Sequence, residues 1–142
     1  MRIYTFILLI AVICGLPLMA NELPRSPSAE GAKVYFIEPN DGDVIAGPEV
    51  VVIFGLSGMG VAPAGIEMKN TGHHHLLIDV DEIDMNMPIP SDAKHKHFGG
   101  GQTETIIELE PGEHSLQLIL ADHLHIPHKP PVVSEVITIT VE

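Results

Sequence analysis

Residues 72–80, with the sequence GHHHLLIDV, form the stretch on which the interpretation of the whole chain depends. A short apolar run of this kind is typical of a β-strand, whose side chains point to opposite faces in turn. We expect the face that carries His74 and Leu76 to pack into the core. His73 and His75 then project together from the outer face at the start of the strand. Because imidazole is the commonest protein ligand for transition metals, this pair is a candidate metal site.

Two further pairs with the same His-x-His spacing occur later in the chain. His95 and His97 precede a run of glycines, and His123 and His125 follow an apolar segment. A single pair of this kind is weak support for a metal site, because such histidines are often simply solvated. The hypothesis therefore depends on whether the fold brings the three pairs together.

Length and composition favour one compact β domain. The chain has 142 residues, with 13 glycines, 12 prolines and only 4% aromatic residues. This composition is typical of short strands joined by many turns, and the sequence contains no amphipathic helix or internal repeat. We predict an all-β fold, an antiparallel immunoglobulin-like β-sandwich, with a jelly roll as the alternative. The expected strands are residues 33–38, 48–55, 72–80, 103–110, 113–122 and 132–142.

The sandwich topology predicts that the three histidine pairs meet at one pole. The strand over residues 72–80 takes the position conventionally called C, and residues 113–122 take position F beside it, running antiparallel. The start of one strand therefore lies beside the end of the other, which brings the first and last histidine pairs together. Residues 103–110 begin at the same pole, directly after the middle pair.

The N-terminus predicts export. Arg2 is followed by an apolar run of the length of a signal sequence, and residues 18–20 (LMA) form a plausible cleavage site. We predict a signal peptide over residues 1–20, a flexible leader over 21–32 and a single β-sandwich domain over 33–142. The expected location is the periplasm or the exterior of the cell.

The predicted mature chain has no thiol and a strongly acidic surface. The only cysteine, Cys14, lies in the predicted signal peptide, and Ile13 before it disfavours a lipid-anchored alternative. Because Arg2 is the only charged residue in that segment, its removal takes the formal net charge from −12 to −13. Such a surface attracts cations and repels nucleic acid and anionic membranes. We expect no nucleic-acid partner and no membrane insertion after cleavage.

The remaining histidines are interpreted by their positions. His128 follows His125 by three residues in a proline-flanked loop, and it is either a further ligand or a neighbour of one. His74 points inward, where it either bonds a backbone carbonyl or orients a ligand. His114 lies beside a Pro-Gly turn at the opposite pole and is expected to be structural. The candidate metal ligands are therefore His73, His75, His95, His97, His123, His125 and His128.

These motifs also resemble a known family. Residues 58–65 (GMGVAPAG), 70–79 (NTGHHHLLID), 97–104 (HFGGGQTE) and 122–128 (DHLHIPH) are similar to a bacterial exported family described only as domain of unknown function 4399. The resemblance covers about residues 33–142. It implies export and a single domain but no settled activity, so the metal hypothesis rests on the residues themselves.

The ligand types favour copper, with zinc as the alternative. Neutral imidazoles without a thiolate suit Cu(II), Zn(II) or Ni(II), and the general affinity order favours copper. Methionines in the expected loops either supply soft thioether ligands for Cu(I) or fill gaps in the packing. Since the predicted mature chain begins at Asn21, a chelate through an N-terminal histidine is not expected. The methionines concerned are Met59, Met68, Met85 and Met87.

Acidic residues and glycines near the histidines leave alternatives open. Asp79, Asp92, Glu104 and Asp122 are either partners for ligand N–H groups or solvated side chains. Residues 99–101, three consecutive glycines, permit a tight backbone path, and an anion-binding nest is the alternative.

The expected function is metal handling. We predict an exported protein that buffers or delivers copper, with a periplasmic or membrane metal-handling protein as its partner. One alternative is a cupin-like metal enzyme, which is disfavoured because Glu104 follows His97 at too long a spacing and no nucleophile stands beside a base. Another is a partner-binding sandwich without metal, whose histidines sense pH.

Overall fold

The computed structural model describes residues 23–142, so the predicted signal peptide lies outside the described range. These residues form an all-β domain, which confirms the expected fold class. No helix within this range has the length and apolar character needed to cross a membrane. The strands are β1 (Lys33–Glu38), β2 (Val44–Ile45), β3 (Glu49–Ser57), β4 (Gly60–Val61), β5 (Thr71–Ile78), β6 (His95–His97), β7 (Glu104–Glu108), β8 (Gly112–Ala121), β9 (Pro127–Val133) and β10 (Ile137–Val141).

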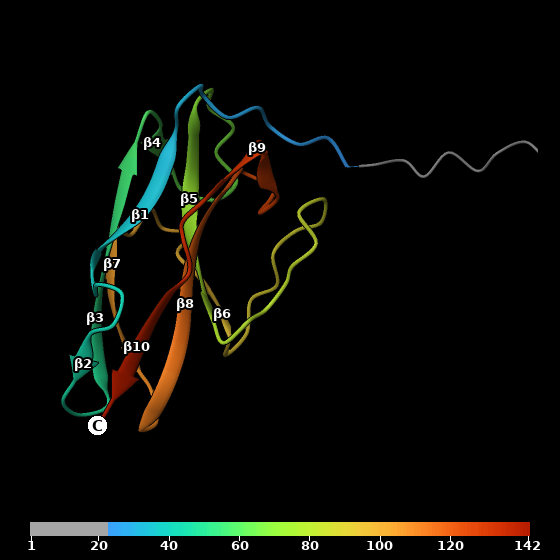
Figure 1. The fold of residues 1–142 in the computed structure, drawn as a ribbon. Helices are drawn as coiled ribbons and strands as arrows, with labels where there is room; N and C mark the ends of the chain where they lie inside the picture. Colours follow the sequence, from blue (N-terminus) through green and yellow to red (C-terminus); the bar gives the residue numbers. More distant parts are fainter. Residues whose placement is uncertain (1–22) are drawn as a thin grey trace, which may run out of the picture.

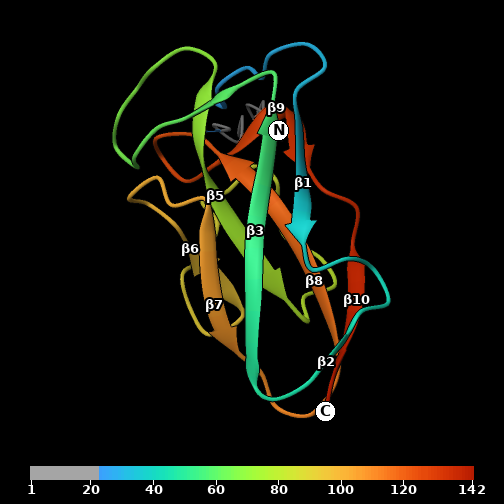
Figure 2. The same cartoon turned by 90° about the vertical axis from the view of Figure 1, so that its left-hand side faces the viewer.

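The strands form two sheets packed face to face (Figure 1). One sheet has the order β1-β3-β7. The other has the order β2-β10-β8-β5-β4, with β6 also paired to β5 and β9 also paired to β8. All pairs are antiparallel except the short pairs β2–β10 and β4–β5. This arrangement confirms the predicted antiparallel sandwich, and Figure 2 shows the three-stranded sheet in front of the larger one.

The predicted pairing of the tri-histidine strand is also confirmed. β5 and β8 run antiparallel, with His73 opposite Ala121 and Leu76 opposite Leu118. The start of β5 therefore lies beside the end of β8. Any side chain that follows β8 closely is placed near the histidines at the start of β5.

The main core lies between the two sheets. Val52 and Phe54 of β3 pack in one buried cluster with Leu76 of β5 and with Leu118 and Leu120 of β8. Each of these strands contributes alternate residues, as expected when one face of a sheet is buried against another sheet. Leu118 and Leu120 therefore lie on the inner face of β8.

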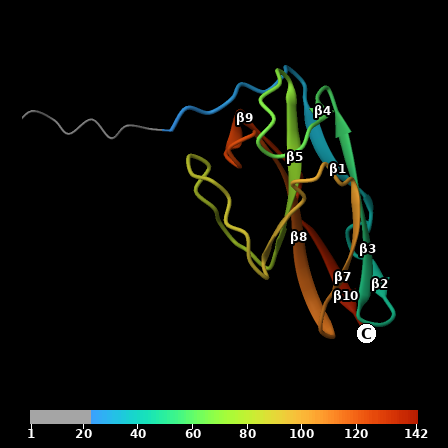
Figure 3. The same cartoon turned by 180° about the vertical axis from the view of Figure 1, so that it is seen from behind.

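The other face of β5 and β8 differs from the prediction. It points away from the main core, as expected, but it is not open to solvent, because His73 and His75 are buried. The segment over residues 79–94, which connects β5 to β6, lies on this side of the sheet (Figures 1 and 3). Ile89 from this segment packs against Ile119 of β8 in a second, smaller hydrophobic cluster. A loop that alternation cannot predict thus covers the candidate site.

The expected final strand is broken into two. β9 and β10 pair with different parts of β8, and Ser134 lies between them. The Ser134 hydroxyl accepts a hydrogen bond from the Leu118 N–H, and the Ser134 N–H donates to the Leu118 carbonyl. These bonds fix the position of the chain between the two strands. β9 begins at Pro127, which places His128 in a strand rather than in the expected loop.

The described part of the expected leader lies against the domain. The Arg25 guanidinium donates to the carbonyl oxygens of Pro127 and His128 and to the side chain of Asn86. The N–H of Ser26 donates to the Asp122 carboxylate at 3.2 Å. These contacts tie the segment to the start of β9 and to the loop that covers β5.

Candidate metal centre

The strands β5 and β6 place three of the predicted ligands on one face of the larger sheet. His73 and His75 are two residues apart on β5, so they project from the same face. β6 pairs antiparallel with β5, and His97 lies directly opposite His75. Side chains opposite each other in such a pair are close neighbours on one face. The first and second histidine pairs therefore contribute three imidazoles to one place.

A tight turn after β8 supplies the fourth imidazole. The Asp122 carboxylate accepts hydrogen bonds from the N–H groups of Leu124 and Ile126, and the His125 N–H donates to the Asp122 carbonyl at 2.9 Å. His125 itself has a left-handed backbone conformation, with φ of 66°. This conformation is uncommon outside glycine, and the surrounding hydrogen bonds hold it. The turn directs the His125 ring back toward the start of β5.

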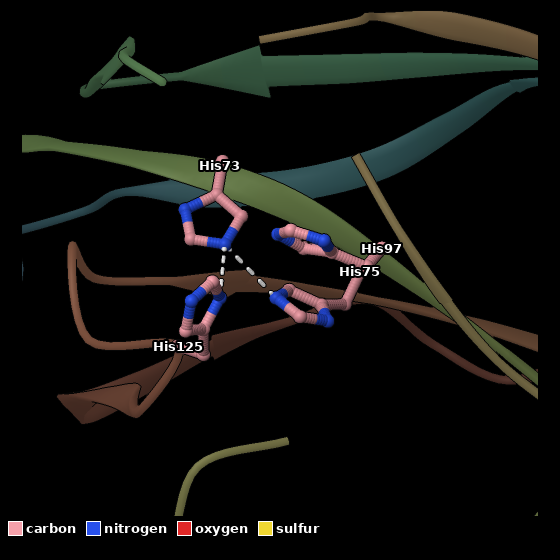
Figure 4. Close-up of side chains that lie close together, drawn as sticks. All are labelled: His73, His75, His97 and His125. Carbon is pink, nitrogen blue, oxygen red and sulfur yellow. Dashed lines mark hydrogen bonds between the residues drawn. The ribbon is translucent and has the colours of Figure 1, made fainter. Parts of the chain in front are cut away.

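The four rings come together at distances suited to a transition-metal ion. One ring nitrogen from each of His73, His75, His97 and His125 lies within 4.8 Å of the others. The Nε2 atom of His73 is 3.1 Å from Nδ1 of His125 and 3.0 Å from Nε2 of His75 (Figure 4). Four nitrogens bound at 2.0–2.1 Å around an ion are roughly 3.3 Å apart in a tetrahedron. The group therefore needs little rearrangement to hold one ion.

Burial favours the neutral form of three of these imidazoles, those of His73, His75 and His97. The pKa of His73 is lowered to about 4, mainly by desolvation and also by the nearby His125 and His97, while Asp122 acts in the opposite direction. Desolvation also lowers the pKa of His75 to about 2, with the neighbouring histidines adding to the effect. The pKa of His97 is lowered by the same causes. A neutral imidazole has the free lone pair that a metal ligand requires, so the lowered pKa values of His73, His75 and His97 favour metal binding over protonation.

The comparison with known families agrees with the resemblance noted from the motifs. The family described as "Domain of unknown function (DUF4399)" matches residues 52–142, which is most of the chain. The chain belongs to the DUF4399 family. Comparisons with curated proteins and with solved structures find no match. All four converging histidines lie within the matched part of the DUF4399 domain.

His95 lies outside the group, although it is on the same face of the sheet. It is paired with Leu77, two residues further along β5 than His75. Two strand residues span about 7 Å, so the His95 ring is displaced along the sheet by that distance. Its Nδ1 atom is instead 2.9 Å from the carboxylate of Asp92. Asp92 is therefore a partner of a histidine outside the group, and its pKa is lowered by that hydrogen bond.

His123 and His128 also lie outside the group. The turn that brings His125 inward leaves His123 on the other side, where it lines a small cavity of about 220 Å³ together with His128. The ring of His128 is buried, with Nδ1 at 3.2 Å from the Leu120 carbonyl and Nε2 at 3.1 Å from the Thr71 carbonyl. Both ring nitrogens of His128 thus face backbone acceptors. Of the seven residues that the sequence nominates, the structure brings four together.

The two histidines expected to be structural have different surroundings. His74 points into the main core as predicted, with its ring centroid 5.0 Å from that of Phe54, but neither ring nitrogen has a hydrogen-bond partner. Desolvation lowers the pKa of His74 to about 4. His114 bridges the Asp79 carboxylate and the Glu110 carbonyl, each at 2.8 Å, which agrees with the structural role expected at the opposite pole. The hydrogen bond that His114 donates to the Asp79 carboxylate raises the pKa of His114.

Of the four acidic residues that the sequence left open, Asp79 and Asp122 accept hydrogen bonds from backbone N–H groups. The Asp79 carboxylate accepts from His114 and from the Ser115 N–H, far along β5 from the four histidines. Burial acts to raise the pKa of Asp79, but these hydrogen bonds bring it below its ordinary value. Asp122 is buried and accepts from three backbone N–H groups, which hold its pKa low against the effect of burial. Asp122 acts on the site by shaping the turn that carries His125.

The methionines and the glycine run have identifiable packing roles. Met59 packs against the main core and Met85 against the second cluster, whereas Met68 and Met87 are exposed. Gly99 lies against the His97 ring, since a Cβ atom placed there would be 2.3 Å from Cε1 of that ring. Gly101 has a positive φ of 83°. The tight backbone path expected for the glycines is therefore required by the position of a candidate ligand.

Proposed function

We propose that this protein binds one transition-metal ion through His73, His75, His97 and His125, and that it buffers or delivers copper outside the cytoplasm. The observation that carries the proposal is the convergence of four ring nitrogens from three separate segments, all within 4.8 Å of one another. Two of these ligands lie on β5, one on β6 and one in the turn after β8.

A hydrogen-bonded cluster without an ion accounts poorly for this arrangement. An imidazole nitrogen has either one hydrogen or one lone pair, so Nε2 of His73 cannot make full hydrogen bonds to both of its neighbours. In addition, the Nδ1 atoms of His73 and His75 are buried with no hydrogen-bond partner. Unsatisfied buried polar atoms are costly, and this cost at Nδ1 is present with or without an ion, so the support for an ion comes from the contacts of His73 Nε2.

Copper is the proposed ion, and zinc is the alternative. The group offers four imidazoles and no thiolate, a set that suits Cu(II), Zn(II) and Ni(II). Within this set the general order of affinities favours copper. Met59 and Met85 pack against hydrophobic clusters and Met68 and Met87 are exposed, so the proposal of copper rests on the imidazoles.

Export and metal handling are the proposed cellular context. The apolar N-terminal run and the plausible cleavage site support a signal peptide and a periplasmic or secreted location. The formal net charge of −12 favours the approach of cations over that of anions. A periplasmic or membrane metal-handling protein is the partner that such a role requires.

Elemental analysis of the untagged protein, purified from its native periplasm without added metal, tests this proposal. We expect close to one copper ion per chain. A variant in which His73, His75, His97 and His125 are all alanine, purified in the same way, provides the background. Zinc in place of copper would keep the site and change the ion. No bound metal, together with no uptake on titration with Cu(II) or Zn(II), would contradict metal binding and leave the buried histidines as a pH-sensing group.

A further inference from the structure

The four candidate ligands are not held equally. His73 and His75 are buried on β5, in the interior of the larger sheet, and the His125 turn is fixed by the Asp122 hydrogen bonds. Their ring nitrogens also contact each other, at 3.0 and 3.1 Å. His97 makes no such contact and ends the three-residue strand β6, which pairs only with β5. The structure thus contains three well-anchored ligands and one weakly anchored ligand.

His97 also borders an open groove. β6 is an edge strand of the larger sheet and β7 is an edge strand of the three-stranded sheet, and the two lie at the same side of the sandwich (Figure 2). A groove of about 540 Å³ runs between them, lined by His97, Lys96 and Phe98 on one side and by Thr105 and Ile106 on the other. The two buried ligands do not line it. A ligand that approaches through this groove therefore meets His97 first.

The space around the His97 ring is provided by the absence of a side chain at Gly99. A Cβ atom at Gly99 would be 2.3 Å from Cε1 and 2.5 Å from Nε2 of His97, both closer than contacts in folded proteins allow. The two closest obstructing atoms belong to the end of a side chain, and the next is the Ala64 Cβ at 3.2 Å, so a substitution here mainly displaces the His97 ring. The backbone at Gly99 does not have a positive φ, so alanine is compatible with its conformation.

We propose that His97 is the exchangeable ligand of the metal centre and that the groove between β6 and β7 is the route by which the ion leaves. This inference rests on the proposed metal-binding function. In the exchange step, a nitrogen, oxygen or sulfur donor of an incoming chelating ligand bonds the ion while the bond between the ion and His97 breaks. No electron is transferred, and His97 retains its lone pair as a free imidazole. His73, His75 and His125 hold the ion until the incoming ligand has replaced them in turn.

The rate of metal release distinguishes this role from that of an ordinary ligand. The full chain is loaded with Cu(II), and loss of its visible absorption is followed by stopped flow after mixing with excess EDTA. We expect His97→Ala to keep one Cu(II) per chain and to release it about tenfold faster or more. His95→Ala, the matched variant on the same strand and face, should release copper at the wild-type rate.

A substitution that narrows the groove should slow the release of copper. Ile106→Trp adds bulk to an exposed groove residue, and we expect it to slow transfer to EDTA severalfold without changing the dissociation constant of the ion. Val51→Trp is the matched control, because Val51 is exposed directly opposite Ile106 on β3 but does not line the groove. An unchanged transfer rate in Ile106→Trp would overturn the proposed route.

Gly99→Ala tests whether the ring position matters. We expect copper affinity to fall by about 10- to 100-fold, the range typical when the orientation of a ligand is disturbed. The effect should disappear when Gly99→Ala is combined with His97→Ala, since the ring is then absent. Gly60→Ala, where a Cβ atom meets only an ordinary contact of 3.5 Å, is the control.

The outcomes separate this inference from the proposed function. If the wild type binds no copper, the metal site itself is contradicted. If the wild type binds copper but His97→Ala releases it at the wild-type rate, or fails to bind it at all, only the exchange role is overturned. Faster release from His97→Ala with retained binding supports both.

Discussion

The outer faces of the two sheets contrast in what they carry and in what covers them. The outer face of β5 and β8 carries His73 and His75, and these polar side chains are buried beneath the loop over residues 79–94. The outer face of the three-stranded sheet carries Val51 and Ile106, and these apolar side chains are 46% and 60% exposed. Polar side chains are thus buried on one outer face, and apolar side chains are exposed on the other, which is the opposite of what the residue types suggest. The path of the connecting loops, rather than alternation along the strands, decides which face becomes a chemical site.

Covering one face has a direct chemical consequence. Removal of water from the β5–β8 face lowers the pKa values of His73 and His75 far enough to keep both rings neutral. Neutral, desolvated imidazoles whose Nδ1 atoms lack hydrogen-bond partners are poor for stability, but the lone pairs of their Nε2 atoms are suited to metal binding. Among the described residues, no such pair of buried histidines lies on the open face, where Val51 and Ile106 are exposed.

The largest expected effect comes from removing the two histidines of the covered face. In His73→Ala/His75→Ala, copper affinity should fall by at least about a thousandfold, or roughly 4 kcal/mol, because half of the ligands are lost. The far-ultraviolet circular dichroism should stay that of a folded β domain. Competition titration of Cu(II) against a chromophoric chelator measures the affinity.

The matched control for that variant is His95→Ala/His123→Ala. It also removes two histidines from His-x-His pairs, but both lie outside the group of four. Its copper affinity should stay within about threefold of the wild type. A thousandfold loss in this control would show that the site is not the one described here.

Acid should destabilise the metal-free protein through the covered face. The pKa values of His73 and His74 are about 4 and that of His75 is about 2 in the folded state, below the ordinary value of 6.5. The unfolded chain therefore binds more protons between pH 6.5 and 4, so stability is full above this window and is lost as the pH falls through it. The slope is about 1.4 kcal/mol per pH unit for each proton. Urea denaturation at several pH values measures it, and a flat profile would contradict the burial of neutral histidines.

A pair of identical substitutions compares the two faces directly. Ile119 of β8 is fully buried in the second cluster, so Ile119→Ala should lower the free energy of unfolding by about 2–5 kcal/mol. Ile106 of β7 is 60% exposed, so Ile106→Ala should cost less than about 1 kcal/mol. Equal costs in urea denaturation would show that the two faces are covered to the same extent.

The smallest expected effect separates the core histidine from the metal site. His74→Leu replaces a buried ring that has two unsatisfied nitrogens, so it should stabilise the protein by about 1–3 kcal/mol at pH 7. Copper affinity should stay within about threefold, because His74 points to the opposite face of β5. Loss of copper binding in this variant would mean that His74 orients a ligand.

Much of this arrangement follows from local sequence patterns. Alternation along residues 72–80 separates inward His74 from outward His73 and His75, and the expected pairing with residues 113–122 brings the chain after β8 to the same pole. Composition and turn signals suffice for the all-β sandwich. These patterns predict on which face of the sheet a side chain lies and near which end of a strand it lies, because both properties depend on the backbone.

The final choice of ligands depends on features that those patterns do not contain. The sequence does not distinguish His95 from His97 as a ligand. The register of β6 makes the choice, because it places His97 opposite His75. The selection of His125 over His123 depends on the left-handed turn built by Asp122. Residues 79–94 cover the site because Ile89 packs in the second cluster, and this segment has no regular sequence pattern that would predict such packing. The glycine run does indicate a crowded position next to His97. Gly99 is explained by the His97 ring, which occupies the space that a Cβ atom would fill.

X-ray absorption at the metal edge of the copper-loaded full chain tests the central claim most directly. We predict one Cu(II) per chain with a first shell of nitrogen at about 2.0 Å, the multiple-scattering pattern of several imidazoles, and no sulfur. His95→Ala/His123→Ala should give the same spectrum. A shell dominated by water or carboxylate oxygen without imidazole scattering would contradict the four-histidine site, as would the same spectrum from His73→Ala/His75→Ala.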